Sequence, residues 1–397
     1  SLKELRDTNG HSPNHIFKFM GLDYRYVADG NDLRAMINAC REVKDVDHPL
    51  VLHVNTLKGK GYAPAVKEKM RYHWRAPFDL KTGEDKAPAP KETYSDAILK
   101  ELDQEIKDGR QLVAINAAIP GVFDLKKFQA KHPDRYFDVG IAEQASISTA
   151  VGMASLGVEP VVFENGTFLQ RAYDQLVHDL ALNDSDATII VRGATISSGS
   201  ATHQGTFTAS MITDLPNIEC LAPTNVEELI SMLRWAINEH DHPVAIIVPE
   251  HGVRHGKVEQ SNYDAIDYQV VHHGSEVAIM AVGGFFELGE KVQAELKKKL
   301  NIDATLINPK SIIGIDQSDL HHLKENHDLV VTIEDGNLSG GFGETIDRYF
   351  GPTNMKILNF GAPREFADNV PLDVLYQWYH LKPDLIVDDI QQVLHSM

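Results

Sequence analysis

The chain has 397 residues, of which 43% are hydrophobic and 24% charged, and its formal net charge is −19. This is the composition of a globular protein long enough for two or three domains, and the acidic balance argues against a nucleic-acid or anionic-membrane partner. With two distant cysteines, a disulfide framework or cysteine metal clip is excluded. The sequence has no membrane-length apolar run and no signal-peptide core, so we expect a cytoplasmic protein.

The first 65 residues alternate between helix and strand patterns. Strands are predicted at 24–27 and 50–54, with a helix at 31–43 between them, which indicates a parallel α/β sheet. Asp29-Gly30 and Asn55 could offer oxygen ligands to Mg²⁺, but the first glycine of such a motif is missing. We therefore predict no metal ligand in this chain.

Residues 66–92 are rich in Lys, Pro and Asp and are predicted to form a linker. Residues 93–252 form a second predicted domain, and a second linker at 253–275 leads to a third domain at 276–397. Both later domains alternate apolar strands with helices, which predicts doubly wound parallel sheets of the α/β class. Their expected strands are at 111–115, 159–163, 187–191, 218–221, 244–248, 276–282, 303–307, 329–333 and 356–358. The glycine run at 339–344 indicates tight helix packing rather than a dinucleotide site.

Several polar or aromatic side chains follow the predicted strands of the second domain, where ligands of wound sheets bind. Glu143 is predicted in the first turn of a small-residue helix, where the helix dipole alone would explain an acid. Phe168, Arg171, Arg192 and His203 come after later strands. On residue type alone, Arg192 could be a salt-bridged strand end and His203 a solvated loop histidine.

Three runs then narrow the interpretation, namely Gly-Ile-Ala-Glu-Gln-Ala at 140–145, Gly-Thr-Phe-Leu-Gln-Arg-Ala-Tyr-Asp-Gln at 166–175 and Ala-Thr-His-Gln-Gly at 201–205. In this order they resemble motifs of the transketolase group of thiamine-diphosphate enzymes, most of all the 1-deoxy-D-xylulose-5-phosphate synthase family. Lys-Gly-Lys-Gly-Tyr-Ala-Pro at 58–64 and the segment 72–79, with Tyr72-His73-Trp74, add to this resemblance. It implies that residues 1–65 end a diphosphate-binding domain, followed by a pyrimidine-binding domain and a transketolase C-terminal domain.

The resemblance also implies roles for individual residues. Glu143 would be the catalytic carboxyl that hydrogen-bonds the aminopyrimidine ring, and Phe168 would stack on that ring. His203 would bind the substrate oxygen and assist proton transfer, and Arg192 would bind the phosphate of the acceptor. His73 is a further catalytic candidate, or else a solvated linker histidine, and Lys60 is a further cofactor candidate.

This chain departs from the family pattern mainly on the acceptor side. The histidine after Glu-Gln is Ala145, the residues before the Thr-Phe run are Asn165-Gly166, and an aspartate before Thr-His-Gln-Gly is Gly199. In the family pattern, the position of a second phosphate-binding arginine corresponds to the run 247–252, which has no arginine here. Thiamine chemistry is therefore better supported than the identity of the substrates.

The resemblance implies a thiamine-diphosphate- and Mg²⁺-dependent transferase that condenses pyruvate with glyceraldehyde 3-phosphate, as in isoprenoid biosynthesis, and that forms a homodimer. The alternatives are a transketolase that moves a two-carbon ketol unit, or an incomplete, non-catalytic chain that needs a missing domain or partner. We expect the chain to begin inside the diphosphate-binding domain, with the diphosphate and Mg²⁺ site outside it.

Overall fold

The computed structural model describes residues 2–13, 15–73, 75–88, 90–257 and 262–396. Trp74 of the predicted motif, residue 89 of the first predicted linker and residues 258–261 of the second lie outside the described residues. The chain forms two compact units, Ser1–Lys91 and Glu92–Met397, and each is described by itself. Within the described residues, no helix is both long and apolar enough to cross a bilayer.

The first unit contains a β-α-β element, as predicted. Strands β1 and β2 pair in parallel, with Asp23 opposite Leu50 and Val27 opposite Val54. Helix α3 connects them and begins at the side chain of Asp32, which accepts a hydrogen bond from the Ala35 amide as an N-cap. The elements of this unit are α1 Leu2–Asp7, α2 Ile16–Phe19, β1 Asp23–Val27, α3 Leu33–Val43, β2 Leu50–Val54 and α4 Ala63–Lys67.

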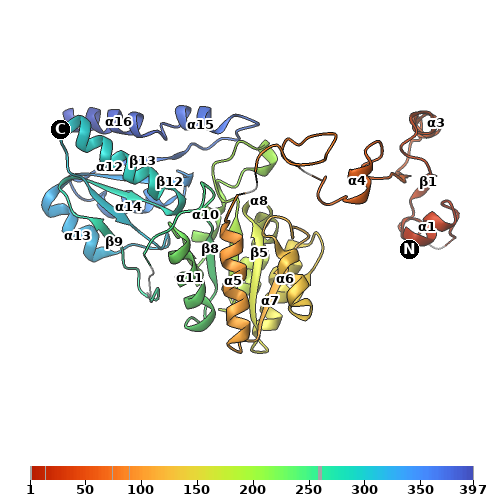
Figure 1. Ribbon diagram of the computed structural model, residues 1–397, viewed down its shortest axis with the longest axis horizontal. Coiled ribbons are helices and arrows are strands. Elements are labelled where there is room, and N and C mark those ends of the chain that lie inside the picture. The colour runs from red at the N-terminus through yellow and green to blue at the C-terminus, as the bar shows by residue number, and fades with distance from the viewer. Residues whose placement is uncertain (1, 14, 74, 89, 258–261, 397) are drawn as a thin grey trace. The chain divides into compact units, whose positions relative to one another are not determined.

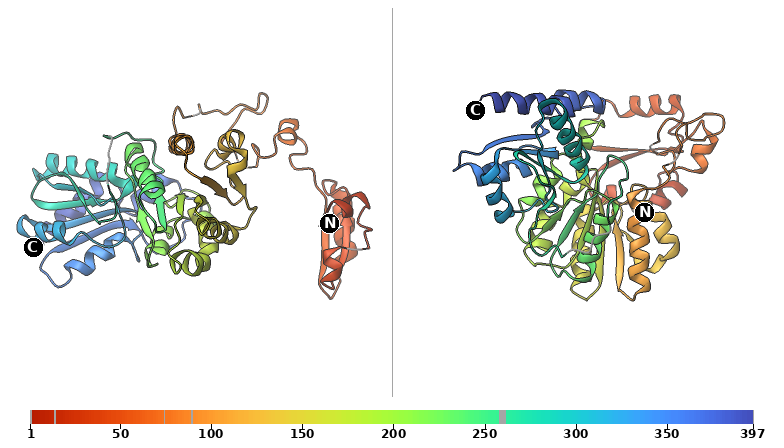
Figure 2. Two further views of the ribbon diagram at one scale, coloured as in Figure 1. Left: turned by 90° about the horizontal axis from the view of Figure 1, so that it is seen from below. Right: turned by 60° about the vertical axis from the view of Figure 1, so that its left-hand side comes forward.

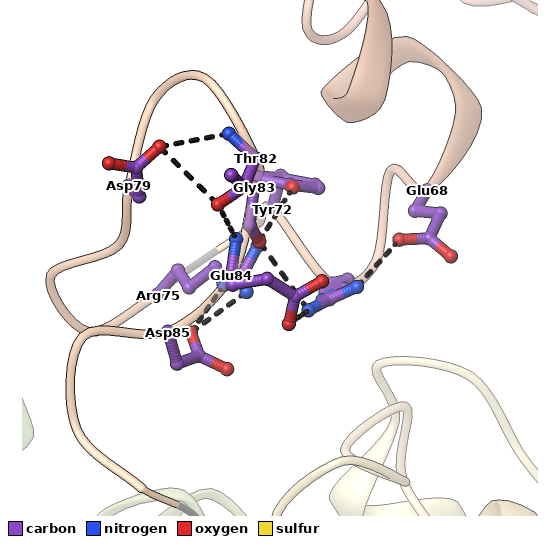
Figure 3. A network of polar contacts seen from close by, with 9 residues as sticks. Glu68, Tyr72, Arg75, Asp79, Thr82, Gly83, Glu84 and Asp85 are labelled. Carbon is purple, nitrogen blue, oxygen red and sulfur yellow. Dashed lines mark hydrogen bonds and ion pairs between the residues drawn. The ribbon is translucent and has the colours of Figure 1, made fainter.

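Polar contacts organise the segment after α4 (Figure 3). Arg75 donates from Nε to Asp85 at 2.8 Å, and its guanidinium carbon lies 4.6 Å from the centre of the Tyr72 ring. Asp79 accepts from the backbone amide of Thr82 at 2.9 Å, which closes a tight turn. This part of the predicted linker is therefore folded back on itself rather than extended.

The first sheet of the second unit has six parallel strands in the order β4-β3-β5-β6-β8-β7. The central strand β5 is apolar at Val161–Phe163 and fully buried there, as expected for a parallel sheet covered on both faces. Figure 1 shows helices on both sides of this sheet. Its elements are α5 Tyr94–Lys107, β3 Leu112–Asn116, α6 Leu125–Lys131, β4 Tyr136–Asp138, α7 Glu143–Ala154, β5 Glu159–Asn165, β6 Thr188–Arg192, α10 Thr208–Thr213, β7 Glu219–Leu221, α11 Val226–Asn238 and β8 Val244–Ile247.

The helical segment after β5 is not one regular helix. It runs through α8 Gly166–Leu169, the 3₁₀ turn Gln170–Ala172, α9 Tyr173–Gln175 and the π-helical turn Leu176–Ala181. Tightened and widened turns of this kind occur preferentially at functional sites, because they re-aim the side chains that they carry.

The second sheet has the order β13-β12-β10-β11-β9. Four strands are parallel, but β9 pairs antiparallel with β11 at the edge, in a stretch where the sequence predicts only linker. Helices α12 and α16 pack against each other beside this sheet (Figures 1 and 2). The elements are β9 Gln269–His272, β10 Glu276–Ala281, α12 Phe286–Leu300, β11 Thr305–Asn308, α13 Gln317–Asn326, β12 His327–Asn337, α14 Phe342–Phe350, β13 Lys356–Ala362, α15 Leu372–Trp378 and α16 Pro383–His395.

Backbone hydrogen bonds and a shared apolar core join the two sheets. The Ile312 amide donates to the Cys220 carbonyl at 3.0 Å, and the Asn337 amide donates to the Thr206 carbonyl at 2.9 Å. One buried cluster contains side chains of both sheets, such as Ile189 and Met280. The α/β class with wound parallel sheets is thus confirmed, and the loops after β4, β5, β6 and β8 lie at one edge of the first sheet.

Candidate active site

Glu143 lies at the start of α7, just beyond the end of β4, and its side chain is buried. It is 2% exposed, and its Oε2 accepts a hydrogen bond from Nη1 of Arg171 at 2.7 Å. Among the described residues, Oε1 of Glu143 has no hydrogen-bond partner. The fold therefore leaves one oxygen of a buried carboxyl without a hydrogen-bond partner among the described residues, while an arginine holds the other.

Phe168 and His203 contact each other across two loops. Their ring centres are 5.7 Å apart with an interplanar angle of 77°, an edge-to-face arrangement. Nδ1 of His203 lies 2.9 Å from Oγ1 of Thr202 and 3.3 Å from Oγ of Ser200. Because Nδ1 is engaged locally, Nε2 is the ring atom left for a ligand.

The loop that carries His203 is held by the Thr-His-Gln-Gly run itself. Nε2 of Gln204 has two hydrogens to donate and lies within hydrogen-bond distance of four backbone carbonyl oxygens, those of Ser197, Gly199, Ser200 and Ala367. A Cβ at Gly205 would lie 1.6 Å from the carbonyl oxygen of Gly193, so only glycine fits there. These contacts fix the loop against the end of β6 and place His203 beside Phe168.

Arg192, at the end of β6, is bound by an acid from the loop after β8. Its Nε and Nη2 donate to the two oxygens of Glu250 at 3.0 and 2.6 Å, and its Nη1 donates to the Val122 carbonyl at 2.7 Å. Glu250 also accepts from the Gly193 amide at 2.9 Å. Every nitrogen of this guanidinium is thus engaged by the protein, and the predicted phosphate contact is occupied by a carboxylate of the same chain.

The remaining predicted site residues lie in the first unit. His73 Nδ1 is 2.6 Å from Nζ of Lys58, and Nζ of Lys60 is 3.4 Å from Oδ1 of Asp29. Asn55 donates its side-chain amide to the Ala28 carbonyl at 3.2 Å, so the Asp29–Asn55 pattern is held by protein contacts. No group of three His, Cys, Asp or Glu side chains that could hold a metal ion is found in the part of the chain that the structure describes.

Two polar features of the second unit have no counterpart in the sequence-based prediction. Glu164, near the end of β5, is fully buried, and burial raises its pKa to about 8. His251 is hydrogen-bonded to Asp335 at 2.6 Å; burial alone would lower its pKa, but this contact raises it. Glu164 could have been recognised as an acid at the end of an apolar strand, whereas the His251–Asp335 contact joins residues 84 positions apart and left no local signal.

A cavity lies between the two sheets rather than at Glu143. It has a volume of about 40 Å³ and is lined in part by Ala194, Pro249, Glu334 and Asp335. This space is about large enough for a single water molecule. The geometry of Glu143, Phe168 and His203 is therefore a better guide to the site than this cavity.

Comparisons with known proteins agree over both sheets. Residues 91–255 match the family "Transketolase, pyrimidine binding domain", and residues 267–386 match "Transketolase, C-terminal domain". Proteins named 1-deoxy-D-xylulose-5-phosphate synthase from Clostridium botulinum and Methylacidiphilum infernorum are 36% and 34% identical over 95% and 96% of this chain. The matched part is 61% of each relative, so the chain spans about three fifths of their length.

Two solved structures share the fold. One, described as "Split gene transketolase, inactive beta4 tetramer", has a TM-score of 0.65 and 21% identity, over 76% of this chain and 98% of its own. The other, a transketolase R525L mutant from Pichia stipitis, has a TM-score of 0.60 and 16% identity, over 95% of this chain and 67% of its own.

Proposed function

Because this chain belongs to the transketolase family, whose pyrimidine-binding and C-terminal domains it carries, we propose that it works as part of a thiamine-diphosphate-dependent transferase. The proposed reaction is that named for its relatives, the synthesis of 1-deoxy-D-xylulose 5-phosphate from pyruvate and glyceraldehyde 3-phosphate with release of carbon dioxide. The observation that carries the proposal is the buried carboxyl of Glu143, with one oxygen held by Arg171 and the other without a partner among the described residues.

The residues of the second unit fit the pyrimidine half of the cofactor. Glu143 offers a carboxyl in a dry setting, which suits a hydrogen bond to a ring nitrogen, and Phe168 offers an aromatic ring for stacking. We still predict that the residues that bind the diphosphate and Mg²⁺ lie outside this chain. Lys60 and His73 of the first unit stay predicted contributors to the site.

When bound, thiamine diphosphate would supply a carbon nucleophile for reaction with a 2-oxo acid. Glu143 would hold a proton between its Oε1 and the pyrimidine ring, and Arg171 would keep the carboxylate in place through Oε2. His203 would hydrogen-bond the substrate oxygen through Nε2, because its Nδ1 is engaged by Thr202 and Ser200.

Arg192 was predicted to bind the acceptor phosphate, but its guanidinium is already bonded to Glu250. Arg192 stays a proposed substrate contact, but an acceptor phosphate would have to compete with Glu250 for its guanidinium. We therefore propose that this protein discriminates weakly in favour of phosphorylated acceptors. A transketolase-type transfer of a two-carbon ketol unit stays the alternative for the reaction, and a cytoplasmic homodimer stays the expected setting.

The test is carbon dioxide release from pyruvate by the natural protein that contains this chain, with thiamine diphosphate, Mg²⁺ and a panel of acceptor aldehydes. We expect cofactor-dependent release with glyceraldehyde 3-phosphate or glyceraldehyde, and a loss of at least about 100-fold in Glu143→Gln. Glu325→Gln, the same change of side chain at an exposed position of α13, serves as the matched control. Transfer from a ketose phosphate without carbon dioxide would support the ketol transferase, and failure to turn over either donor would contradict the proposal.

A further inference from the structure

A second carboxyl lies beside Glu143 and has no role in the function proposed above. Glu164 is 0% exposed, and its Oε2 has no hydrogen-bond partner among the described residues. The strand that carries it is otherwise apolar at Val161–Phe163. An ionised carboxylate in such a place would leave a buried charge without compensation, which is strongly unfavourable.

Ser146 connects the two carboxyl-bearing residues. Its hydroxyl oxygen lies 2.6 Å from Oε1 of Glu164 and 2.7 Å from the backbone carbonyl oxygen of Glu143. A hydroxyl has one hydrogen, so it can donate to only one of these two oxygens. If Glu164 is protonated, both short contacts can be hydrogen bonds. The acid then donates to the Ser146 hydroxyl, and the hydroxyl donates to the carbonyl of Glu143.

The charges around Glu164 lead to the same protonation state. The charged groups that face it are Glu143 on α7 and Arg171 on the 3₁₀ turn after α8. Arg171 is bonded to Glu143, and its own side chain is half exposed. One guanidinium is therefore available for two carboxyls. It bonds Glu143, and Glu164, which it does not bond, is the more deeply buried of the two. Burial, with a further contribution from the charge of Glu143, raises the pKa of Glu164 against the opposing effects of Ser146 and Arg171.

We propose that Glu164 is a positioning residue for Glu143: it carries the proton of a coupled carboxyl pair, so that Glu143 alone holds the negative charge. The neutral acid bonds Ser146 in the first turn of α7 and thereby fixes the carboxyl that begins this helix. The pair resists losing a second proton near neutral pH, because two adjacent buried carboxylates repel each other. The positioning role rests on the proposed function of Glu143, whereas the pair itself is a property of the folded chain.

Infrared spectroscopy between pH 5.5 and 9 tests the pair without cofactor. Because burial also raises the pKa of Glu159 and Glu334, to about 9 and about 7, the band of Glu164 is read as the difference between the natural protein and Glu164→Gln. We expect this difference to contain a protonated-carboxyl component that disappears near pH 8 and that the apolar variant Glu164→Met also lacks. In Glu143→Gln the band should persist, with its midpoint about one pH unit lower, because the neighbouring charge is gone. Circular dichroism confirms that each variant is folded. The absence of the band, or a midpoint that does not move in Glu143→Gln, would overturn the proposal.

The positioning role is tested on the cofactor-loaded enzyme by the pH dependence of its rate. We expect Glu164→Gln to remove the loss of rate that accompanies ionisation of Glu164 near pH 8, and Ser146→Ala to leave that ionisation in place. An unchanged profile in Glu164→Gln, alongside a positive infrared result, would overturn the positioning role. A natural protein with the infrared signature but no cofactor-dependent rate would overturn the proposed function, and the positioning role with it, while the carboxyl pair would stand.

Discussion

Two acids at the same edge of the first sheet of the second unit are compensated in different ways: Glu164 lies near the end of β5, and Glu250 lies in the loop after β8. Glu250 meets Arg192 in a two-point ion pair and also accepts from a backbone amide. Glu164 meets only a serine hydroxyl and lies beside a second carboxyl. An arginine that is paired with a carboxylate binds other anions less readily, whereas a buried acid without an ion-pair partner stays protonated. The comparison indicates that the charge of Arg192 is neutralised within the chain, whereas Glu164 has no ion-pair partner among the described residues.

The largest expected effect comes from removing the ability of Glu164 to ionise. Its pKa is about 8 in the folded chain and about 4.5 when unfolded, so the folded protein loses stability as the pH rises between these values. Glu164→Gln stays neutral and should escape this loss, gaining about 4 kcal/mol over the natural protein between pH 5 and pH 8.5.

Urea unfolding of both proteins at several pH values measures this difference. Glu250→Gln is the matched control, because it makes the same change of side chain at the compensated acid and should show no such gain. A stability difference between Glu164→Gln and the natural protein that does not vary with pH would mean that Glu164 is ionised in the folded chain.

A smaller effect is expected from breaking the compensated pair. The side chains of Arg192 and Glu250 are 27% and 19% exposed, so loss of either partner leaves a partly buried charge. Glu250→Gln and Arg192→Met should each cost about 2 kcal/mol, and the double variant should cost less than the sum of the two. The coupling energy from urea unfolding of the four proteins measures the pair, and strict additivity would mean that it contributes nothing.

The sequence could predict the architecture because parallel strands buried on both faces are read as apolar runs. The strands at 50–54 and 159–163 were predicted within two residues of β2 and β5. The edge strand Gln269–His272 was missed, since it is partly exposed, antiparallel and lies beside a histidine-rich turn. In the helical segment after β5, the local sequence does not reveal the shift through 3₁₀ and π turns.

The candidate site was predictable only where a local motif carries it. Glu143, Phe168 and His203 stand in short runs, and the structure brings the last two into contact. The roles assigned to them stay predictions. Arg192 was also found in this way, but its partner Glu250 is 58 positions away, and only the fold reveals that the two bond. Charge compensation of this kind is a tertiary property and leaves no periodic signal in the sequence.

The smallest expected effect is on acceptor selectivity, and it tests whether the Arg192–Glu250 pair limits the binding of phosphorylated acceptors. Glu250→Gln removes the carboxylate that competes for Arg192 but keeps a side chain of the same size in the loop after β8. The guanidinium would then have two donors free for an anion, at Nε and Nη2. We expect KM for glyceraldehyde 3-phosphate to fall about fivefold, equivalent to about 1 kcal/mol, with KM for unphosphorylated glyceraldehyde unchanged. The double variant Arg192→Met, Glu250→Gln should not show this lower KM for glyceraldehyde 3-phosphate. An equal change of KM for both aldehydes would mean that the acceptor phosphate binds elsewhere and that the Arg192–Glu250 pair is structural.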